Sequence, residues 1–413
     1  MDQLRGIPPV SPKNVAIRVT KRAEKKLRQG HPWLFDGGIT DESFSPKGGD
    51  IAIVFDQKRK FLSVGLYDPD SPIRVKMLAA GKPAKISGDW FLARLKDAAD
   101  KRAHLAETST TGYRLVYGEG DYLPGLIIDK YADTLVIKIY SAAWFPHLES
   151  VLAGLDAIMP NMRWVLRLSR NVQAGETWGL KDGMILQGDP LDGPVPFTEN
   201  GLNFAADVIR GHKTGFFFDH RDNRQRLGKL AKNKTVLDVF SYTGGFSLYA
   251  AAGGAKSVMS LDVSQPALDA AKANFALNAG LPNVANCRHD TVAADAFQVL
   301  EDLATSGRLF DLVVVDPPSF AKNKSEVDGA IKAYERLTRL ALGVLAEQGL
   351  LVMASCSSRV PASLFFNTVL DTADEVGRPL WEQFRTGHAA DHPLRPEFPE
   401  GEYLKCGYFS AID

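Results

Sequence analysis

The feature that most constrains the fold is a regular alternation of strand and helix patterns in the second half of the chain. From about residue 190, short apolar segments are separated by longer segments with helical periodicity. Residues 310–315 are apolar except for Asp311, as expected for a strand buried on both faces of a parallel sheet. This pattern predicts a doubly wound, Rossmann-like α/β sheet that binds ligands at the carboxyl ends of its strands. The predicted strands are 236–240, 257–263, 285–289, 310–315 and 350–354, and the predicted helices are 245–253, 265–279, 291–306 and 324–346.

A chain of 413 residues is too long for one ordinary core, and the pattern divides it into three expected domains. Residues 14–82 predict a β-rich domain with one basic helix, residues 88–187 a central mixed α/β domain, and residues 190–413 the doubly wound domain. In the first two domains the predicted strands are 15–19, 51–55, 61–67, 73–77, 113–117, 125–130, 134–140 and 163–168, and the predicted helices are 20–29, 90–107 and 145–158.

The composition favours a reducing cytoplasm. No apolar run reaches the roughly 18 residues of a membrane helix, and the first 14 residues lack the apolar core of a secretory signal. The three cysteines, Cys287, Cys356 and Cys406, form no disulfide framework and no pair has metal-ligand spacing, so we expect no metal. A homodimer is compatible with the sequence, which sets no oligomeric state.

Basic residues gather at the N-terminus although the net charge is zero. Residues 1–30 contain eight Lys or Arg and two Asp or Glu, followed by the aromatic segment 31–35. Such a cluster is either a solvated face or a surface that meets RNA phosphates and bases. The candidate RNA contacts on the predicted helix are Lys21, Arg22, Lys25 and Lys26.

Polar residues at the predicted strand ends form a candidate cofactor site. Asp238 lies before a glycine pair, Asp262 ends the next strand 24 residues later, and Asp290 is expected to end the third. Glycine lets a backbone approach a ligand closely, and a carboxylate at the second strand end can accept hydrogen bonds from ribose hydroxyls. The alternative is a set of ordinary turn residues. The candidates are Asp238, Tyr242, Thr243, Gly244, Gly245, Asp262 and Asp290.

S-adenosylmethionine (SAM) suits this site better than a dinucleotide. The loop lacks the G-x-G-x-x-G pattern whose helix N-terminus holds a pyrophosphate. SAM has no phosphate, and its ammonium and ribose groups match a carboxylate-rich site. The pattern therefore predicts a SAM-dependent methyltransferase.

Two features at the remaining strand ends bear on catalysis. The turn Asp316-Pro317-Pro318-Ser319-Phe320 fixes the backbone where a substrate base would lie, and similar turns occur in enzymes that methylate base amino groups. Cys356 is expected at the end of the fifth strand, on the same edge as Asp316. Carbon 5 of a pyrimidine is a poor nucleophile, and thiolate attack on C6 activates it, whereas amino-group methylation needs no thiol. The alternative for Cys356 is a structural role as a small buried residue. The same role is expected for Cys287 and Cys406, which lie within predicted apolar strands.

The chain resembles the bacterial large-subunit (23S) ribosomal RNA cytosine-C5 methyltransferases that carry an N-terminal PUA domain. The matching phrases occur in order along nearly the whole chain: 31–35, 114–120, 123–125, 212–221, 240–246, 316–318, 355–357 and 390–393. The resemblance implies a PUA domain, a central α/β domain, SAM as methyl donor, RNA as partner and Cys356 as nucleophile. It also implies that residues 214–221 lie beside the cofactor, which adds Asp219 and Arg221 to the cofactor candidates. Asp316, in the Pro-Pro turn, is a further cofactor candidate.

Two positions depart from the family pattern. Residues 166–170 lack the acidic side chains that relatives often carry, so no role is inherited there. Ser319 stands where many RNA cytosine-C5 enzymes have a second cysteine, which leaves the base that removes the C5 proton unassigned.

The sequence therefore predicts an RNA cytosine-C5 methyltransferase with Cys356 and Asp316 in catalysis and Pro317, Pro318 and Phe320 beside the target base. Amino-group methylation by Asp316 and Phe320, uracil-C5 methylation, and an RNA-binding module with a vestigial methyltransferase fold are the alternatives.

Overall fold

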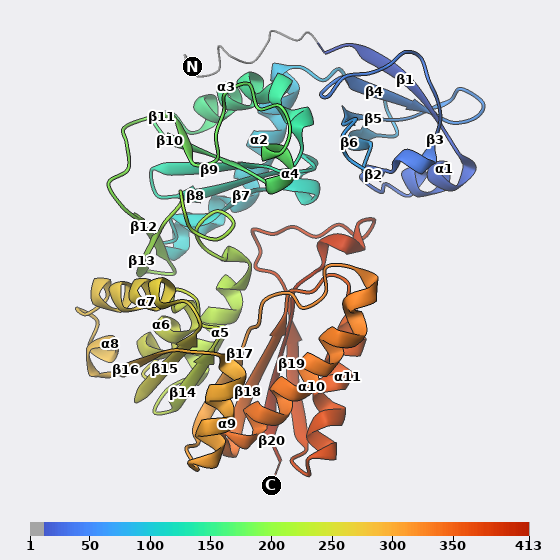
Figure 1. Ribbon diagram of the computed structural model, residues 1–413. Helices are drawn as coiled ribbons and strands as arrows, with labels where there is room; N and C mark the ends of the chain where they lie inside the picture. The colour runs from blue at the N-terminus through green and yellow to red at the C-terminus, as the bar shows by residue number, and fades with distance from the viewer. Residues whose placement is uncertain (1–11, 413) are drawn as a thin grey trace. The chain divides into compact units, whose positions relative to one another are not determined.

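The computed structural model describes residues 12–412 (Figure 1). The chain divides into two compact units. Unit 1 contains the chain up to Glu199 together with Ala206–Phe216 and Asp391–Gly401. Unit 2 contains Asn200–Ala205, Phe217–Ala390 and Glu402–Asp413. A segment from near the end of the chain thus belongs to the first unit. The first 14 residues, which were predicted to lack a secretory signal, lie mostly outside the described residues.

The first sheet of unit 1 has six strands in the order β2-β6-β5-β4-β1-β3. Its core contains Val15, Ile17 and Val54, each fully buried. The helix α1 (Lys21–Arg28) begins where the Thr20 side chain accepts a hydrogen bond from the Ala23 amide. The strands are β1 (Asn14–Val19), β2 (Trp33–Leu34), β3 (Ile39–Glu42), β4 (Ile51–Phe55), β5 (Phe61–Tyr67) and β6 (Val75–Ala80).

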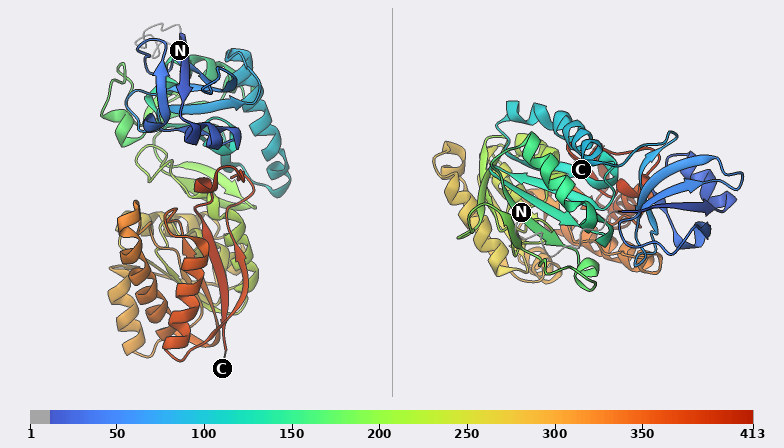
Figure 2. Two further views of the ribbon diagram at one scale, coloured as in Figure 1. Left: turned by 90° about the vertical axis from the view of Figure 1, so that its right-hand side faces the viewer. Right: turned by 90° about the horizontal axis from the view of Figure 1, so that it is seen from above.

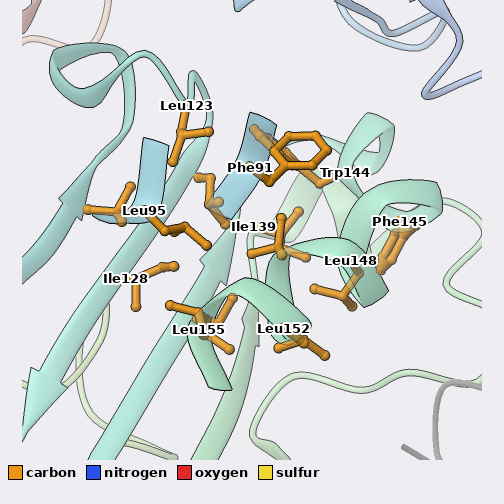
Figure 3. Packing of buried hydrophobic residues seen from close by; sticks show 14 of the residues in the cluster. Phe91, Leu95, Leu123, Ile128, Ile139, Trp144, Phe145, Leu148, Leu152 and Leu155 are labelled. Carbon is orange, nitrogen blue, oxygen red and sulfur yellow. The ribbon is translucent and has the colours of Figure 1, made fainter. Parts of the chain in front are cut away.

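The second sheet of unit 1 has five strands in the order β11-β10-β9-β8-β7. The helices α2 (Gly88–Arg102) and α3 (Leu148–Ile158) pack together and against this sheet. Figure 3 shows their leucines meeting Ile128 and Ile139 of the strands. The other elements are β7 (Gly112–Tyr117), β8 (Leu126–Tyr131), β9 (Thr134–Ile139), β10 (Arg163–Leu168), the short α4 (Arg170–Gln173) and β11 (Met184–Gln187).

The inserted segment Asp391–Gly401 is part of the polar interior of unit 1. The fully buried Asp391 carboxylate accepts a hydrogen bond from the Arg114 amide at 2.8 Å. The Asp391 carbonyl accepts one from Arg102 at 2.7 Å, and the Arg395 guanidinium donates to the Gly30 carbonyl at 3.0 Å. The inserted segment is therefore bound to β7, to α2 and to the turn after α1.

Unit 2 holds a seven-stranded sheet in the order β16-β15-β14-β17-β18-β20-β19. All neighbouring strands are parallel except β20, which is antiparallel to both of its neighbours. Helices cover both faces of the sheet (Figure 2). The strands are β14 (Thr235–Val239), β15 (Ser257–Asp262), β16 (Arg288–Ala293), β17 (Phe310–Val315), β18 (Leu345–Ser355), β19 (Leu380–Thr386) and β20 (Lys405–Ala411).

The helices of unit 2 form two groups. One contains α5 (Arg221–Leu230), α6 (Gly245–Ala252) and α7 (Gln265–Leu277), and the other contains α9 (Ala296–Thr305), α10 (Val327–Gly343) and α11 (Ala362–Glu375). The short strands β12 (Val195–Glu199) and β13 (Leu202–Ala206) lie in the part of the sequence where the chain passes from one unit to the other. Between residues 12 and 412, no helix is long and apolar enough to cross a membrane.

One predicted strand of the doubly wound sheet is wrong. Residues 285–289 were expected to be extended, but Pro282–Asn286 form the short helix α8, and β16 begins only at Arg288. Asp290 is therefore inside the strand, three residues before its end, and Cys287 lies between α8 and β16 rather than within a strand. The following helix begins at Ala296, not at residue 291.

Candidate functional site

The carboxyl ends of four adjacent strands bring most of the predicted site residues to one edge of the sheet. From β14 the chain runs outward through β15 and β16, and then returns to the other side of β14 with β17 and β18. A reversal of this kind opens a crevice between the first strand and its new neighbour, where doubly wound proteins bind ligands. Asp262 ends β15, Asp316 follows β17, and Cys356 follows β18.

The loop after β14 has an unusual backbone. Phe240, Tyr242 and Gly244 have positive φ angles of 65°, 48° and 74°. The left-handed region is costly for the two bulky aromatic residues, and such strain gathers at functional turns. The Ser241 amide donates to the Leu261 carbonyl at 3.0 Å, which fixes this loop to the neighbouring strand β15.

The glycine pair in this loop makes room for protein atoms rather than for a ligand. A Cβ on Gly244 would lie 2.8 Å from the Ala271 Cβ, and one on Gly245 would lie 2.9 Å from the Arg224 Cδ. The lack of a Cβ at both positions is thus required by the packing of this loop, and close approach of the loop backbone to a cofactor stays a prediction. Any role in cofactor binding rests on their backbone atoms and stays a prediction.

Asp238 offers a buried acceptor to a ligand. Its Oδ2 accepts hydrogen bonds from the Ser247 amide at 3.0 Å and the Ser247 hydroxyl at 2.6 Å. Burial raises the pKa of Asp238 to about 7, against the lowering effect of Ser247 and with smaller increases from the Asp316 and Asp262 charges. Among the described residues, its Oδ1 and the buried Ser241 and Thr243 hydroxyls have no hydrogen-bond partner. Buried polar atoms normally have partners, so these atoms fit a donor such as the ammonium group of SAM.

Asp262 is held ready to accept further hydrogen bonds. Its Oδ2 accepts from the Tyr242 amide and its Oδ1 from the Ser264 amide, both at 2.9 Å. These bonds fix the carboxylate plane, while each oxygen keeps a second lone pair for a ribose hydroxyl. The next residue, Val263, is 78% exposed, and this apolar side chain is available to pack on a flat ring.

Asp290 does not occupy the strand end that was predicted for it. It pairs with Met259 in the sheet, three residues before Asp262, and its carboxylate forms an ion pair with Arg288 at 3.1 Å. The chain leaves β16 at Ala294, whose amide donates to the Asp262 carbonyl at 3.1 Å, and Asp295 follows. Asp295 caps α9 by accepting from the Gln298 amide at 3.1 Å and is exposed. It is the acidic residue at this edge that the sequence analysis missed.

The segment 214–221 is divided between the two units. Thr214 belongs to unit 1, where its hydroxyl donates to Asp129 at 2.5 Å. Asp219 and Arg221 belong to unit 2 and are both buried. The Asp219 carboxylate accepts from the Tyr403 hydroxyl at 2.7 Å, and Arg221 pairs with Asp222 at 3.4 Å. These protein contacts give both residues a structural role, and their contact with a cofactor stays a prediction.

His220 lies beside Asp316 and was not among the predicted site residues. Its Nε2 is 3.3 Å from the Asp316 Oδ2. Burial lowers the pKa of His220, but the charge and hydrogen bond of Asp316 and the charge of Asp219 outweigh this effect, and the net pKa is raised. Its Nδ1 lies 3.1 Å from the Asn223 amide nitrogen, which also donates to the Gly387 carbonyl at 3.1 Å. A buried histidine that forms an ion pair with Asp316 when it is protonated therefore lies next to the predicted catalytic carboxylate.

The Ser357 hydroxyl joins the Pro-Pro turn to the Cys356 loop. It accepts from the Phe320 amide at 3.1 Å and lies 3.2 Å from the Ser319 hydroxyl and 3.0 Å from the Tyr334 hydroxyl. The Cys356 Sγ lies 3.9 Å from the Pro317 carbonyl oxygen. The Cys356 thiol, after β18, and the Pro-Pro turn, after β17, are thus neighbours, as was predicted from two strands that end on the same edge of the sheet.

Cys356 differs from the other two cysteines in its exposure. Cys356 is partly exposed, whereas Cys287 and Cys406 are buried. Burial raises the pKa of the Cys287 thiol to about 11 and that of Cys406 to about 12. A buried thiol with a raised pKa is a poor nucleophile, so only Cys356 suits the proposed chemistry.

The basic helix α1 lies in unit 1, and its four candidate residues are all exposed. Arg22 and Lys26 line a cavity of about 270 Å³ together with Trp33 and Phe35. Lys21 and Lys25 instead border a second depression beside Arg28, Asp56, Lys58 and Lys60. Within residues 12–412, no group of three His, Cys, Asp or Glu side chains could hold a metal ion.

The sheet order, with an antiparallel last strand inserted beside β18, and the carboxylates at the crevice define a class I SAM-dependent methyltransferase. A family model described as S-adenosylmethionine-dependent methyltransferase matches residues 114–375, and a PUA-like domain model matches residues 17–80. The chain belongs to the family of SAM-dependent methyltransferases with an N-terminal PUA-like domain whose members are named ribosomal RNA large subunit methyltransferase. The predicted fold class, family and cofactor are thereby confirmed.

The similar proteins cover almost the whole chain. A ribosomal RNA large subunit methyltransferase of Deinococcus radiodurans is 44% identical over 405 residues, 97% of this chain and 98% of the relative. The ribosomal RNA large subunit methyltransferase I of Pseudoalteromonas translucida is 39% identical over 94% of this chain and 98% of its own length. The crystal structure of SMU.776, described as a methyltransferase complexed with SAH, matches with a TM-score of 0.82 at 24% identity, over 96% of this chain and 100% of that one, and supports the fold.

Proposed function

We propose that this protein methylates carbon 5 of a cytosine in large-subunit ribosomal RNA through a covalent bond between Cys356 and C6. The observation that carries the proposal is the partly exposed Cys356 at the end of β18, with its sulfur 3.9 Å from the Pro317 carbonyl of the turn that contains Asp316. The names of the relatives support ribosomal RNA as the substrate.

The target base must leave its stack, because C5 and C6 cannot otherwise meet both the thiolate and the methyl donor. The Cys356 thiolate forms a bond to C6, and the electrons of the C5–C6 double bond make C5 nucleophilic. Asp316, with His220 behind it at 3.3 Å, holds a proton against N3 and stabilises the charge that develops there. After methylation, loss of the C5 proton restores the double bond and releases Cys356.

When bound, SAM supplies an electrophilic methyl group. In the proposed arrangement the unpartnered Oδ1 of Asp238 accepts from the ammonium group, Asp262 accepts from the ribose hydroxyls, and Val263 packs against the adenine. Pro317 and Pro318 hold the backbone beside the target base.

Amino-group methylation is the alternative supported by the Asp316-to-Phe320 turn. In that reaction an aromatic ring stacks on the base. The Phe320 ring instead packs edge-on against Tyr334, with 5.3 Å between ring centroids and an interplanar angle of 62°. This contact leaves part of the Phe320 ring exposed, so the product nucleoside is what separates the two reactions.

The product nucleoside tests the proposal. Large-subunit RNA that lacks the modification is incubated with the protein and labelled SAM, digested to nucleosides and analysed by mass spectrometry. We expect 5-methylcytidine. N4-methylcytidine would support the amino-group alternative, 5-methyluridine would move the substrate to uracil, and an unlabelled digest would contradict the proposed activity.

SAM affinity should depend on Asp262. Each hydrogen bond to a charged group contributes about 1.5–3 kcal/mol, so Asp262→Ala should weaken SAM by roughly tenfold or more in calorimetry. Asp290→Ala is a matched control, because its carboxylate pairs with Arg288. We expect little change in that variant. Equal affinities for SAM in wild type and a folded Asp262→Ala protein would remove Asp262 from the site.

RNA affinity should depend on the face of α1 that borders the aromatic cavity. Reversing Arg22 and Lys26 to glutamate should lower affinity about tenfold and flatten the salt dependence by about 0.7–0.9 per lost phosphate contact. Reversing Lys21 and Lys25 makes the same charge change on the other face and should have the smaller effect, because no aromatic ring lines that depression. SAM affinity is expected to stay constant in both. An unchanged salt slope in filter binding would mean that α1 is only a solvated face.

A further inference from the structure

A buried lysine lies against the loop that carries Cys356. Lys405 is the first residue of β20, is 5% exposed and pairs with Ser355 of β18 in the sheet. Its Nζ donates to the Ser357 carbonyl at 2.7 Å and to the Val360 carbonyl at 2.9 Å. Two of the three ammonium protons therefore hold the backbone that directly follows Cys356.

Burial of the Lys405 ammonium group costs free energy unless a negative charge lies nearby. Burial lowers the pKa of Lys405 to about 8, while the charges of Cys356 and Glu402 act in the opposite direction. A buried ammonium group is tolerated when it is paired and hydrogen-bonded. Two neutral carbonyl groups satisfy its hydrogen bonds but not its charge, and the Cys356 thiolate is a negative group that can balance it.

Two carboxylates act on the residues near the thiol. Asp316 follows β17 and its charge acts on Tyr334, and Glu402 precedes β20 and its charge acts on Lys405. Tyr334 reaches the same place from α10, where burial raises its pKa, so its hydroxyl stays neutral. A nearby cation lowers the pKa of a thiol, and Lys405 is a cation whose hydrogen bonds place it against the loop that carries Cys356.

We propose that Lys405 is the positioning residue of Cys356: its ammonium charge stabilises the thiolate, and its two hydrogen bonds fix the Ser357–Val360 backbone so that the sulfur faces the Pro-Pro turn. The catalytic use of the thiolate rests on the proposed function, but the formation of the thiolate in the free protein does not. There Cys356 loses its proton to solvent, and the positive charge of Lys405 balances the negative charge of the sulfur.

The pH dependence of thiol alkylation tests this assignment without RNA. The full-length protein is treated briefly with iodoacetamide between pH 5 and pH 10, and the modified Cys356 peptide is quantified by mass spectrometry. The buried Cys287 and Cys406 serve as internal controls. In the wild type we expect an apparent thiol pKa below the ordinary value of about 8.5. Lys405→Met, which keeps the chain length and removes the charge, should react about tenfold more slowly at pH 7, the effect of one pKa unit.

Lys405→Arg keeps the charge and should restore most of the reactivity at pH 7, although its larger head group will disturb the loop. Calorimetry with SAM shows whether each variant is folded. A Met variant with the wild-type alkylation profile would leave Lys405 a purely structural residue and overturn the proposal. A wild-type thiol pKa of about 8.5 or higher would also overturn it, even if the Met variant did not fold.

Failure of the proposed function would look different. If the alkylation profile shifts as expected but no covalent species forms with RNA, Lys405 activates Cys356 and the cytosine-C5 mechanism is wrong. If the covalent species forms and the profile does not shift, the mechanism stands and Lys405 has no electrostatic part in it.

Discussion

Cys356→Ala should abolish both methylation and a covalent protein–RNA species while leaving SAM affinity near the wild-type value. The thiol forms the bond to C6, and removal of a nucleophile costs up to roughly 10⁶-fold in other covalent enzymes. RNA with 5-fluorocytosine at the target position blocks the final proton loss. The wild-type protein should then accumulate an adduct that survives denaturing electrophoresis, and the variant should form none.

The other cysteines provide matched controls for this experiment. Cys287→Ala and Cys406→Ala remove a thiol of the same size from buried positions. Both should retain activity and lose only about 1 kcal/mol of stability, typical of a change in a core. A Cys356→Ala protein that still methylates would instead show that the thiol is structural, and would favour amino-group chemistry by Asp316.

Asp316→Ala should lower kcat by roughly 10²–10³-fold, the usual cost of removing one group that stabilises charge in a transition state. Without a proton held at N3, the electrons displaced by thiolate attack have no favourable site, so adduct formation should slow to a similar degree. Single-turnover rates with saturating SAM measure this directly. We expect the loss in kcat to be much larger than the change in SAM affinity.

Asp316→Asn is the informative companion variant. The amide can still donate a hydrogen bond to N3 but cannot share a proton with His220, which lies 3.3 Å from the carboxylate. An intermediate rate is expected. Full activity in the alanine variant would exclude Asp316 from the chemistry and leave it as a turn residue beside the two prolines.

The sequence predicted best those elements whose residues are buried on both sides. The strands 51–55, 61–67, 163–168 and 310–315 agree with the structure to the residue, because continuous apolar or alternating runs leave few other conformations. The bounds of the strand Arg288–Ala293 were predicted wrongly because its first four residues are charged or polar and none of its residues is buried, so no periodic apolar pattern marks it. The short β2 and β3 were missed because two to four residues carry too little pattern.

The same distinction applies to the site. Asp262, Asp316 and Cys356 could be placed together because each follows a predictable strand, and parallel strands end on one edge. The matching phrases 212–221 and 355–357 contain His220 and Ser357, but the contacts of His220 with Asp316 and of Lys405 with Ser357 could not be predicted, because they join segments far apart in sequence. The hydrogen bond from Lys405 to Ser357 spans 48 residues, and Lys405 lies outside every matching phrase.

The late segment Asp391–Gly401 has a consequence for how the chain matures on the ribosome. The Arg114 amide and the Gly30 carbonyl are hydrogen-bonded to residues that are synthesised 277 and 365 positions later. Unit 1 thus cannot complete these hydrogen bonds as its first residues emerge, and stays incompletely closed until residues 391–401 have been made. A chain that terminates before residue 391 would therefore show its defect in the part of unit 1 that had already been translated, which would mark it early for proteolysis.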